Sequence, residues 1–456
     1  VFVESGVGAG QQYTFLKARV TIGRAPDNDV VLLSDASISA THAQLLWRGG
    51  QWEFEDCCSK NGILVERDGM RVPLDERILV DAKDRYLLGR TLVRIGFQTP
   101  TGEPPAEEPP QPPLQTALVL RVDVLGAELR YQLLDSGAYG SEYLVPFDPS
   151  DMLAINARLR AAARTANLAE RGIGPPFLRQ VEDTGRFLSE RLMPRRLVEK
   201  LSETSARQLF LVLARKLARV PWELAMAGEE SLCMRFGVGR QVLMPDFTRR
   251  SLSLPDRAPR LLVVADPTGD FDQARLEAEG LLAHVQRLRP GLEVHYVAGE
   301  RVERADLLER LGSADLVYFT GHVDYDDTDP LQSAWVLMHG RVSCGDFRGL
   351  ARPPLFLFAN GCETCREPDG EVGRGVYGLA GALALAGVHS YLGTLWPVRL
   401  ESSGHFARRC FDHLLTGRPL GDAVRDARLA LRNELGAEDP AWAAYVLYGD
   451  PGTKCL

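Results

Sequence analysis

A proline-rich segment divides the 456-residue chain into two parts. Residues 100–115 (PTGEPPAEEPPQPPLQ) hold seven of its 28 prolines and three glutamates, and they offer almost no apolar side chain to a core. Such a segment favours an extended polyproline conformation with a rise of about 3.1 Å per residue, so it can separate two bodies by on the order of 45 Å. The sequence therefore predicts an N-terminal domain over residues 1–99, a linker over 100–115 and a C-terminal domain over 116–456. Within the last, residues 116–255 form a first part and 256–456 a second.

Charge and composition exclude several classes of protein. The 53 Lys and Arg residues against 61 Asp and Glu residues give a net charge of −8, which disfavours a surface that holds nucleic acid or anionic lipid. The most apolar run, 376–385, is shorter than the roughly 20 residues that cross a bilayer, and no secretory signal is visible. Eight irregularly spaced cysteines do not suit a disulfide framework, so we expect reduced thiols in a cytoplasmic protein.

The N-terminal part reads as short strands separated by turns. Turn signals occur at Asp27-Asn28, Gly49-Gly50, Asn61-Gly62 and Asp68-Gly69. The predicted strands cover 13–16, 19–22, 30–32, 43–47, 52–55, 63–66, 71–72, 85–88 and 91–97. This pattern predicts an all-β sandwich.

Polar residues on the turns of this sandwich suit a phosphate monoester. Arg24 supplies charge, and Ser39 and Asn61 supply uncharged donors. The order GR, then SxxH, then SxNG resembles the forkhead-associated (FHA) domain over residues 13–97. The resemblance implies binding of a phosphothreonine peptide, with phosphate contacts from Arg24 and Ser39 and a peptide-backbone contact from Asn61. It also implies that loops are braced by three further residues: Gly23, His42 and Gly62.

Two positions depart from the common FHA pattern. Ala40 follows the serine where a longer polar residue is usual, and Lys60 stands where a threonine often precedes the asparagine. Lys60 adds a positive charge toward phosphate, whereas the lost polar contacts weaken binding.

After the linker, apolar strands alternate with helical segments. Strands are predicted at 117–124, 261–265, 293–297, 316–320, 355–359, 391–395 and 445–448. Helices are predicted at 151–171, 177–203, 273–288, 303–312, 374–386, 402–415 and 420–435. Continuous apolar strands between helices predict an α/β domain with a mainly parallel sheet covered by helices on both faces.

Reactive residues follow two of these strands, where parallel sheets collect their chemistry. The strand 316–320 runs into Gly321-His322, and the strand 355–359 runs into Asn360-Gly361-Cys362. An imidazole at one strand end can deprotonate a thiol at the next, and the thiolate then attacks a carbonyl carbon. The backbone N–H groups of Val323 and Cys362 are candidates for holding the resulting oxyanion.

Seven segments of the second domain, in order, resemble the CHAT family of caspase-like proteins over residues 180–451. They are VPWELA (220–225), YFTGH (318–322), LFANGCET (357–364), GLAGALALAG (378–387), GTLWPV (393–398), GRPLGDAVRDAR (417–428) and WAAYVLYGDP (442–451). The resemblance implies a clan CD cysteine endopeptidase of bacterial origin with a His/Cys dyad, which maps onto His322 and Cys362, and it implies no metal and no cofactor.

Other interpretations of the same residues stay open. Cys362 and Cys365 form a CxxC, the spacing of redox and zinc motifs, although no second CxxC or nearby His pair completes a zinc site. Asp266 and Asp270, after the first strand of the second part, are interpreted as residues that cap a loop.

Substrate preference is expected to depend on charges near the dyad. Carboxylates crowd the predicted rim at 324, 326, 327, 329, 363, 367, 369, 371 and 401, which suits a basic side chain before the scissile bond. Many family members carry an acidic residue just after LWPV, but here Arg399 follows, a change that favours an acidic side chain instead. The specificity pocket is predicted from Asp324, Glu363, Arg399 and Glu401.

A polar, Gly-rich stretch follows the candidate nucleophile. Residues 365–375 are interpreted as a loop that activates the enzyme by ordering or by self-cleavage, with Arg366 and Arg374 as candidate cut points.

These features predict a cysteine endopeptidase that is recruited or regulated through phosphothreonine. Its expected partners are a phosphothreonine protein or peptide, a protein substrate and a Ser/Thr kinase. The alternative is a catalytically silent caspase-like scaffold, for which phosphothreonine-dependent interaction is the whole function.

Overall fold

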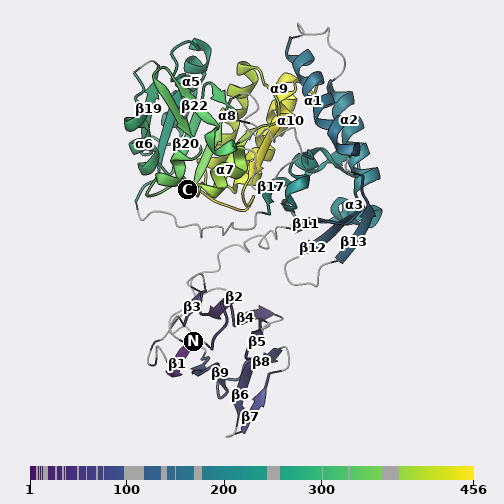
Figure 1. The fold of residues 1–456 in the computed structure, drawn as a ribbon, viewed down its shortest axis with the longest axis vertical. Coiled ribbons are helices and arrows are strands. Elements are labelled where there is room, and N and C mark those ends of the chain that lie inside the picture. The colour runs from purple at the N-terminus through teal and green to yellow at the C-terminus, as the bar shows by residue number, and fades with distance from the viewer. Residues whose placement is uncertain are drawn as a thin grey trace, which may run out of the picture. The chain divides into compact units, whose positions relative to one another are not determined.

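In the computed structural model, the chain forms two compact units, Val1–Pro110 and Gln111–Leu456 (Figure 1). The structure describes residues 1–6, 9, 11, 13, 19–25, 28–32, 35, 37–48, 51–57, 59–67, 70–74, 77–96, 118–134, 141–148, 150–168, 177–243, 257–299, 301–326, 329–361 and 379–456. The predicted linker, 100–115, lies outside these residues.

The first unit is the predicted all-β sandwich, built from two five-stranded sheets. One sheet has the order β1-β10-β9-β6-β7 and the other β3-β2-β4-β5-β8. The strands are β1 (Phe2–Ser5), β2 (Arg19–Gly23), β3 (Val30–Val31), β4 (Ala43–Arg48), β5 (Gln51–Asp56), β6 (Ile63–Arg67), β7 (Met70–Pro73), β8 (Arg77–Leu79), β9 (Arg85–Leu88) and β10 (Thr91–Arg94). Alternate residues such as Val20, Ile22, Tyr86 and Leu88 face inward and form its core.

Two strands of the sandwich were not predicted, and one prediction cannot be compared. The sequence analysis missed β1 and β8, which are short and carry charged residues next to apolar ones. Most of the predicted strand 13–16 lies outside the described residues. β1 pairs with β10 and forms one edge of its sheet.

The second unit is the predicted α/β domain, built on one eleven-stranded sheet. Its order is β13-β12-β11-β14-β17-β26-β25-β24-β20-β18-β19. The strands are β11 (Leu118–Leu125), β12 (Glu128–Leu134), β13 (Ser141–Pro146), β14 (Gln208–Leu213), β17 (Gly237–Val242), β18 (Arg260–Ala265), β19 (Glu293–Ala298), β20 (Leu316–Thr320), β24 (Phe356–Ala359), β25 (Ser390–Thr394) and β26 (Tyr445–Tyr448). β26 pairs parallel to β17 and antiparallel to β25, so the last strand in the chain joins the two halves.

Most neighbouring strands of this sheet run parallel. Antiparallel pairs join β11 to β12, β12 to β13 and β25 to β26, and the other described pairs are parallel. Two small antiparallel sheets lie outside the large one. The first is the hairpin of β15 (Met226–Ala227) and β16 (Glu230–Ser231), and the second has three strands, β21 (Val323–Asp324), β22 (Ala334–Leu337) and β23 (Gly340–Ser343).

Helices cover both faces of the sheet, as the alternation of apolar segments predicts (Figure 1). The helices are α1 (Ser150–Leu168), α2 (Phe177–Phe187), α3 (Arg195–Glu203), α4 (Leu232–Arg235), α5 (Asp272–Leu288), α6 (Arg304–Ser313), α7 (Leu379–Leu385), α8 (Leu400–Leu414), α9 (Leu420–Leu435) and α10 (Ala441–Ala444). Leu261 and Val263 of β18 share one core with α5, α8 and α9, whereas Leu262 and Val264 share the other with α6 and α7. The predicted helix 177–203 is interrupted between α2 and α3. A π-helical turn, Leu188–Leu192, follows α2, and Pro194, which has no N–H to continue a helix, precedes α3.

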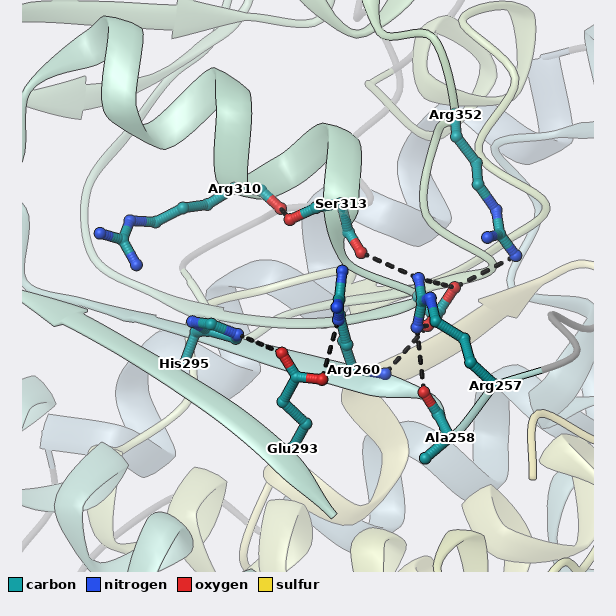
Figure 2. A network of polar contacts seen from close by, with 9 residues as sticks. Arg257, Ala258, Arg260, Glu293, His295, Arg310, Ser313 and Arg352 are labelled. Carbon is teal, nitrogen blue, oxygen red and sulfur yellow. Dashed lines mark hydrogen bonds and ion pairs between the residues drawn. The ribbon is translucent and has the colours of Figure 1, made fainter.

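A polar network fixes the amino ends of three neighbouring strands (Figure 2). The Asp315 carboxylate is fully buried and accepts from Arg257 (Nη1, 2.7 Å) and from the Arg260 main-chain N–H (2.9 Å). Arg352 forms a further ion pair with it at 3.2 Å, and the Asp315 carbonyl accepts from the N–H of Phe356 (3.2 Å). At the opposite edge the same three strands stay paired to their ends, with Ala265 opposite Thr320 and Phe319 opposite Ala359.

Among the residues that the structure describes, no helix is both long enough and apolar enough to span a bilayer.

Candidate functional site

The first candidate site lies on the loops that follow β2, precede β4 and follow β5. The main-chain N–H of Arg24 donates to the Ser39 carbonyl at 2.9 Å, and its side-chain Nε donates to the Ile38 carbonyl at 3.2 Å. The guanidinium is therefore tied to the loop that carries Ser39, although Arg24 as a whole is exposed. A cation held in place on an exposed loop suits capture of an anion from solvent.

Ser39 and Asn61 are brought to the same loops. The Lys60 N–H donates to Ser39 Oγ at 2.9 Å, and Asn61 Nδ2 donates to the Ser37 carbonyl at 2.7 Å. Arg24, Lys60 and Asn61 are exposed, so the structure places two cations and an amide on connected loops. Ser39 Oγ thus stabilises the loop after β5 by accepting from the Lys60 N–H.

The His42 side chain links two of these loops. Its Nδ1 accepts from the Ser39 N–H at 3.0 Å, so its Nε2 carries the proton that bonds the Gly62 carbonyl at 3.1 Å. Burial lowers the pKa of His42, in agreement with a neutral ring that bridges two backbone groups. Gly23 lets the loops approach, since a Cβ there would lie 2.2 Å from the Ala40 carbonyl oxygen.

The second candidate site lies at the carboxyl ends of β20 and β24. These neighbouring parallel strands pair with Phe319 opposite Ala359, and the Asn360 N–H extends the ladder to the Phe319 carbonyl at 2.7 Å. His322 stands three residues after Phe319, and Cys362 stands three after Ala359. Cys362 lies outside the described residues, which end at Gly361 on this strand. The described backbone that follows β24 ends at Gly361, at the same edge of the sheet as His322.

His322 is held by the loop that follows β18. Its Nε2 forms an ion pair with Asp270 Oδ1 at 3.3 Å, and its ring stacks on Phe271 with a centroid distance of 5.2 Å. A hydrogen bond from Thr268, and then the charge of His322, lower the pKa of Asp270. Asp270 accepts from Thr268 within its own loop, and it also contacts the candidate base, a contact that its interpretation as a loop-capping residue did not include.

Asp266 does have the predicted capping role. Its Oδ1 accepts from the N–H groups of Gly269 (2.9 Å) and Phe271 (3.1 Å), and its backbone takes a left-handed φ of 44°. These bonds shape the loop that presents Asp270 and Phe271 to His322.

The backbone N–H of Val323, the residue after His322, points away from the neighbouring strand. The His322 carbonyl accepts from the Val336 N–H at 3.0 Å, and Val323 stands opposite Trp335 in the ladder of β21 and β22. Bonding groups alternate in an antiparallel pair, so the Val323 amide is turned away from β22.

Comparison with known families matches residues 182–450 to the CHAT domain and residues 20–89 to the FHA domain. The first match alone spans more than half of the chain. The chain belongs to the CHAT-domain family. Both resemblances predicted from the sequence are confirmed, and the two candidate sites fall inside the matched segments.

Curated relatives are similar to the FHA domain of this CHAT-family chain. The glycogen accumulation regulator GarA of Mycolicibacterium smegmatis is 31% identical over 97 residues, which cover 21% of this chain and 56% of GarA. The FHA domain-containing protein FhaB of Mycobacterium tuberculosis is 38% identical over 76 residues, covering 16% of this chain and 48% of FhaB. The chain thus spans about half the length of the curated relatives that it matches.

Among solved structures, separase in the Saccharomyces cerevisiae separase–securin complex is similar with a TM-score of 0.49 and 13% identity. The match covers 73% of this chain and 30% of that chain.

The four residues predicted for specificity are not all brought together in the CHAT domain. Arg399 and Glu401 line one hollow between α5 and α8, with Gln273, Leu276, Glu277, Leu400, Gly404, His405 and Arg408. Asp324 instead forms an ion pair with Arg341 at 3.4 Å, and Glu363 lies outside the described residues. The loop 365–375, with Arg366 and Arg374, also lies outside them.

Arg399 is not a free cation in this hollow. Its Nη2 pairs with Asp439 Oδ2 at 3.0 Å, and the Asp439 side chain is only 4% exposed. The expectation that Arg399 favours an acidic substrate side chain is weakened, because Asp439 already compensates its charge.

Four buried cysteines of the second unit lack the environment of a nucleophile. Cys233, Cys344, Cys410 and Cys455 are free thiols, and burial raises the pKa of each. Burial raises the pKa of both Cys410 and Cys455 to about 12, so these thiols stay protonated near neutral pH. Within the described ranges, no cluster of His, Cys, Asp and Glu could hold a metal ion.

Proposed function

We propose that the CHAT domain is a cysteine endopeptidase that uses His322 and Cys362, and that the FHA domain recruits it to phosphothreonine. The observation that carries the proposal is the level end of β20 and β24, with His322 after one strand and Asn360-Gly361 leading to Cys362 after the other. The matched CHAT domain adds support, because both residues fall within it.

We propose that the two ring nitrogens of His322 have different roles, one in binding Asp270 and one in catalysis. Asp270 pairs with Nε2, which leaves Nδ1 to take the proton of the Cys362 thiol. The thiolate attacks the scissile carbonyl carbon and forms a tetrahedral oxyanion. His322 then gives its proton to the leaving amine, and the acyl-enzyme is hydrolysed by a water that His322 deprotonates.

Two backbone amides are proposed for the oxyanion. The Val323 N–H is turned away from β22, and the Cys362 N–H belongs to the nucleophile itself. Two such donors would contribute several kcal/mol, about 3 per donor, to lowering the barrier.

Specificity is proposed to reside in the hollow that contains Arg399 and Glu401. Since Asp439 compensates Arg399, Glu401 is the expected contact for a basic side chain before the scissile bond. The profile of cleaved peptides from Glu401→Gln should lose preference for Lys and Arg, and an unchanged profile would refute this assignment.

For the FHA domain, we propose that Arg24 and Ser39 contact the phosphate and that Asn61 contacts the peptide backbone. The support is the loop geometry, in which Arg24 and Asn61 are exposed and held by backbone carbonyls. The expected partners are proteins phosphorylated by a Ser/Thr kinase.

The test of the enzyme is a peptide-library digest with wild type beside Cys362→Ala. New peptide termini produced by the wild type alone would support the endopeptidase. Equal digests from the two proteins would refute it and favour a silent scaffold that only binds phosphothreonine.

A further inference from the structure

A buried polar cluster lies directly beneath the candidate catalytic edge. Glu277 of α5 accepts at Oε1 from Asn360 Nδ2 (2.8 Å) and from the Tyr318 hydroxyl, and at Oε2 from Ser403 Oγ (3.0 Å). The Tyr445 hydroxyl completes it by donating to Asn360 Oδ1 at 2.8 Å. We call these five residues, which come from α5, β20, the end of β24, α8 and β26, the Glu277 cluster.

The cluster holds Asn360 at every polar atom of its side chain. Asn360 Nδ2 bonds both Glu277 and the Tyr318 hydroxyl (2.9 Å), and Oδ1 bonds Tyr445. The next residue is held as well, since Thr394 Oγ1 donates to the Gly361 carbonyl at 2.8 Å. Because Cys362 follows directly in the chain, these bonds fix the backbone that leads into the candidate nucleophile.

The fold makes room for this carboxyl group at a cost. Glu277 is 9% exposed, and a buried carboxyl group is unfavourable unless donors compensate it. A Cβ at position 404 of α8 would lie 2.8 Å from Glu277 Cγ, so Gly404 admits the side chain. An apolar residue would fill the same space at less cost, but it would leave the Tyr318 hydroxyl and one of the two Nδ2 hydrogens of Asn360 without an acceptor.

We propose that Glu277 is a positioning residue, which acts through Asn360 to hold the backbone before Cys362 in the reactive geometry. The inference rests on the proposed function of His322 and Cys362. The inference concerns a different residue from the proposed catalytic pair, because Glu277 binds Asn360 rather than the substrate.

The cluster can exist in two protonation states. Burial raises the pKa of Glu277 to about 7, against the opposing hydrogen bonds from Tyr318, Ser403 and Asn360. Ser403 Oγ also donates to the Leu400 carbonyl at 2.9 Å, so it can accept from a protonated Glu277 without losing that bond. The ionised form binds Asn360 more strongly, since its bonds are charge-assisted.

The groups that face Glu277 are two tyrosines of its cluster and the charged or titratable residues around the neighbouring hollow. Burial raises the pKa of Tyr318 and of Tyr445 well above the usual value, so both stay neutral. Arg408 is the cation whose charge acts on Glu277. The other charged or titratable residues around the hollow are Arg399, Glu401 and His405.

The experiment compares wild type with Glu277→Gln and Glu277→Leu, and with Glu279→Gln as a matched control on the same helix. Glu279 is exposed and its contact is the Tyr296 hydroxyl at 3.4 Å. Three quantities are measured from about pH 5.5 to 8.5, a range around the usual pKa of His. They are the rate of Cys362 alkylation by iodoacetamide, followed by peptide mass spectrometry, and kcat and KM on a peptide that the wild type cleaves.

We expect Glu277→Leu to lower the alkylation rate and kcat by about tenfold or more, with KM changed by less than about threefold. Glu277→Gln keeps the acceptor for Asn360, so it should retain both rates within about threefold and lose the part of the pH dependence that comes from ionisation of Glu277 near pH 7. Glu279→Gln should match wild type. A folded Glu277→Leu protein with unchanged alkylation and kcat would overturn the proposal. Should that variant not fold, Glu277→Gln profiles of alkylation and kcat that coincide with those of wild type over the whole pH range would overturn it.

The alkylation readout separates this inference from the proposed function. If wild type and Cys362→Ala give the same digest, the peptidase proposal fails, whereas slower alkylation in Glu277→Leu would still support positioning. If the wild type cleaves peptides and all three variants equal it in both readouts, the positioning role alone fails.

Discussion

The two candidate sites hold their polar side chains in opposite ways. In the FHA domain, Arg24 and Asn61 are exposed and bond to backbone carbonyls of one loop. In the CHAT domain, the side chains behind the strand ends are buried and bond to one another across elements far apart in sequence, such as Glu277 and Ser403. The first site is local to its loops, whereas the second depends on how α5, α8 and the sheet pack.

This contrast separates the expected effects of mutation. A change in an exposed FHA side chain should alter binding and leave the free energy of unfolding nearly unchanged. A change in the Glu277 cluster should alter stability and reactivity together, because each buried donor or acceptor depends on the others.

The largest effect is expected at the proposed base of the CHAT site. His322→Ala removes the proposed base and should lower kcat by on the order of a thousandfold, since general base catalysis of a thiol attack is lost. The His322 side chain is 49% exposed, so the midpoint of thermal unfolding should change little. Steady-state kinetics with a peptide cleaved by wild type would check this, and a variant with wild-type kcat would contradict the role of His322.

Stability should depend on pH through the buried site. Glu277 has a folded pKa of about 7 against 4.5 when free, so the folded state binds the extra proton between these values. Its contribution is present below about pH 4.5 and is lost as the pH rises through 7. Relative to Glu277→Gln, wild type should lose on the order of 3 kcal/mol of unfolding free energy over this range. Denaturant titrations at several pH values measure this difference. If the free energy of unfolding of wild type and of Glu277→Gln changed in parallel with pH, the raised pKa of Glu277 would be contradicted.

The exposed site should respond in binding alone. Arg24→Ala should weaken capture of a phosphothreonine peptide by about 2 kcal/mol, roughly thirtyfold, since charge-assisted bonds to phosphate are lost. Isothermal titration would measure this, with Arg71→Ala as a control, because Arg71 is exposed on β7 and pairs with Glu66 at 2.9 Å. Equal affinities for the two variants would refute the phosphate contact.

The smallest effect is expected from the partner of His322. Asp270→Asn keeps a polar contact to the ring but removes the charge that stabilises the imidazolium, so kcat should fall about tenfold. Steady-state kinetics with a peptide that wild type cleaves would measure this. A wild-type kcat in Asp270→Asn would show that Asp270 does not act on His322.

Local patterns in the sequence predicted the parts of both sites that depend on strand ends and turns. The run 316–320 and the run 355–359 were predicted as strands, and the structure places β20 and β24 there side by side. Helices were predicted within a few residues of α5, α6, α8 and α9, because their apolar periodicity is clear.

Contacts between distant segments could not be predicted in this way. Glu277 lies on an ordinary amphipathic helix, and its burial depends on Gly404 and Ser403, 126 residues away in the case of Ser403. The ion pair of His322 with Asp270 requires that the β18 loop lies beside the β20 end. The antiparallel pairing of β26 with β25 was also missed, since apolar runs show burial but not direction.

One measurement tests the combined function most directly. Wild type, Cys362→Ala and Arg24→Ala are incubated with the same peptide library before and after phosphatase treatment, and new termini are counted by mass spectrometry. We predict that wild type cleaves the phosphorylated library more than the treated one, that Arg24→Ala cleaves both alike, and that Cys362→Ala cleaves neither. New termini from Cys362→Ala in wild-type numbers would contradict the endopeptidase.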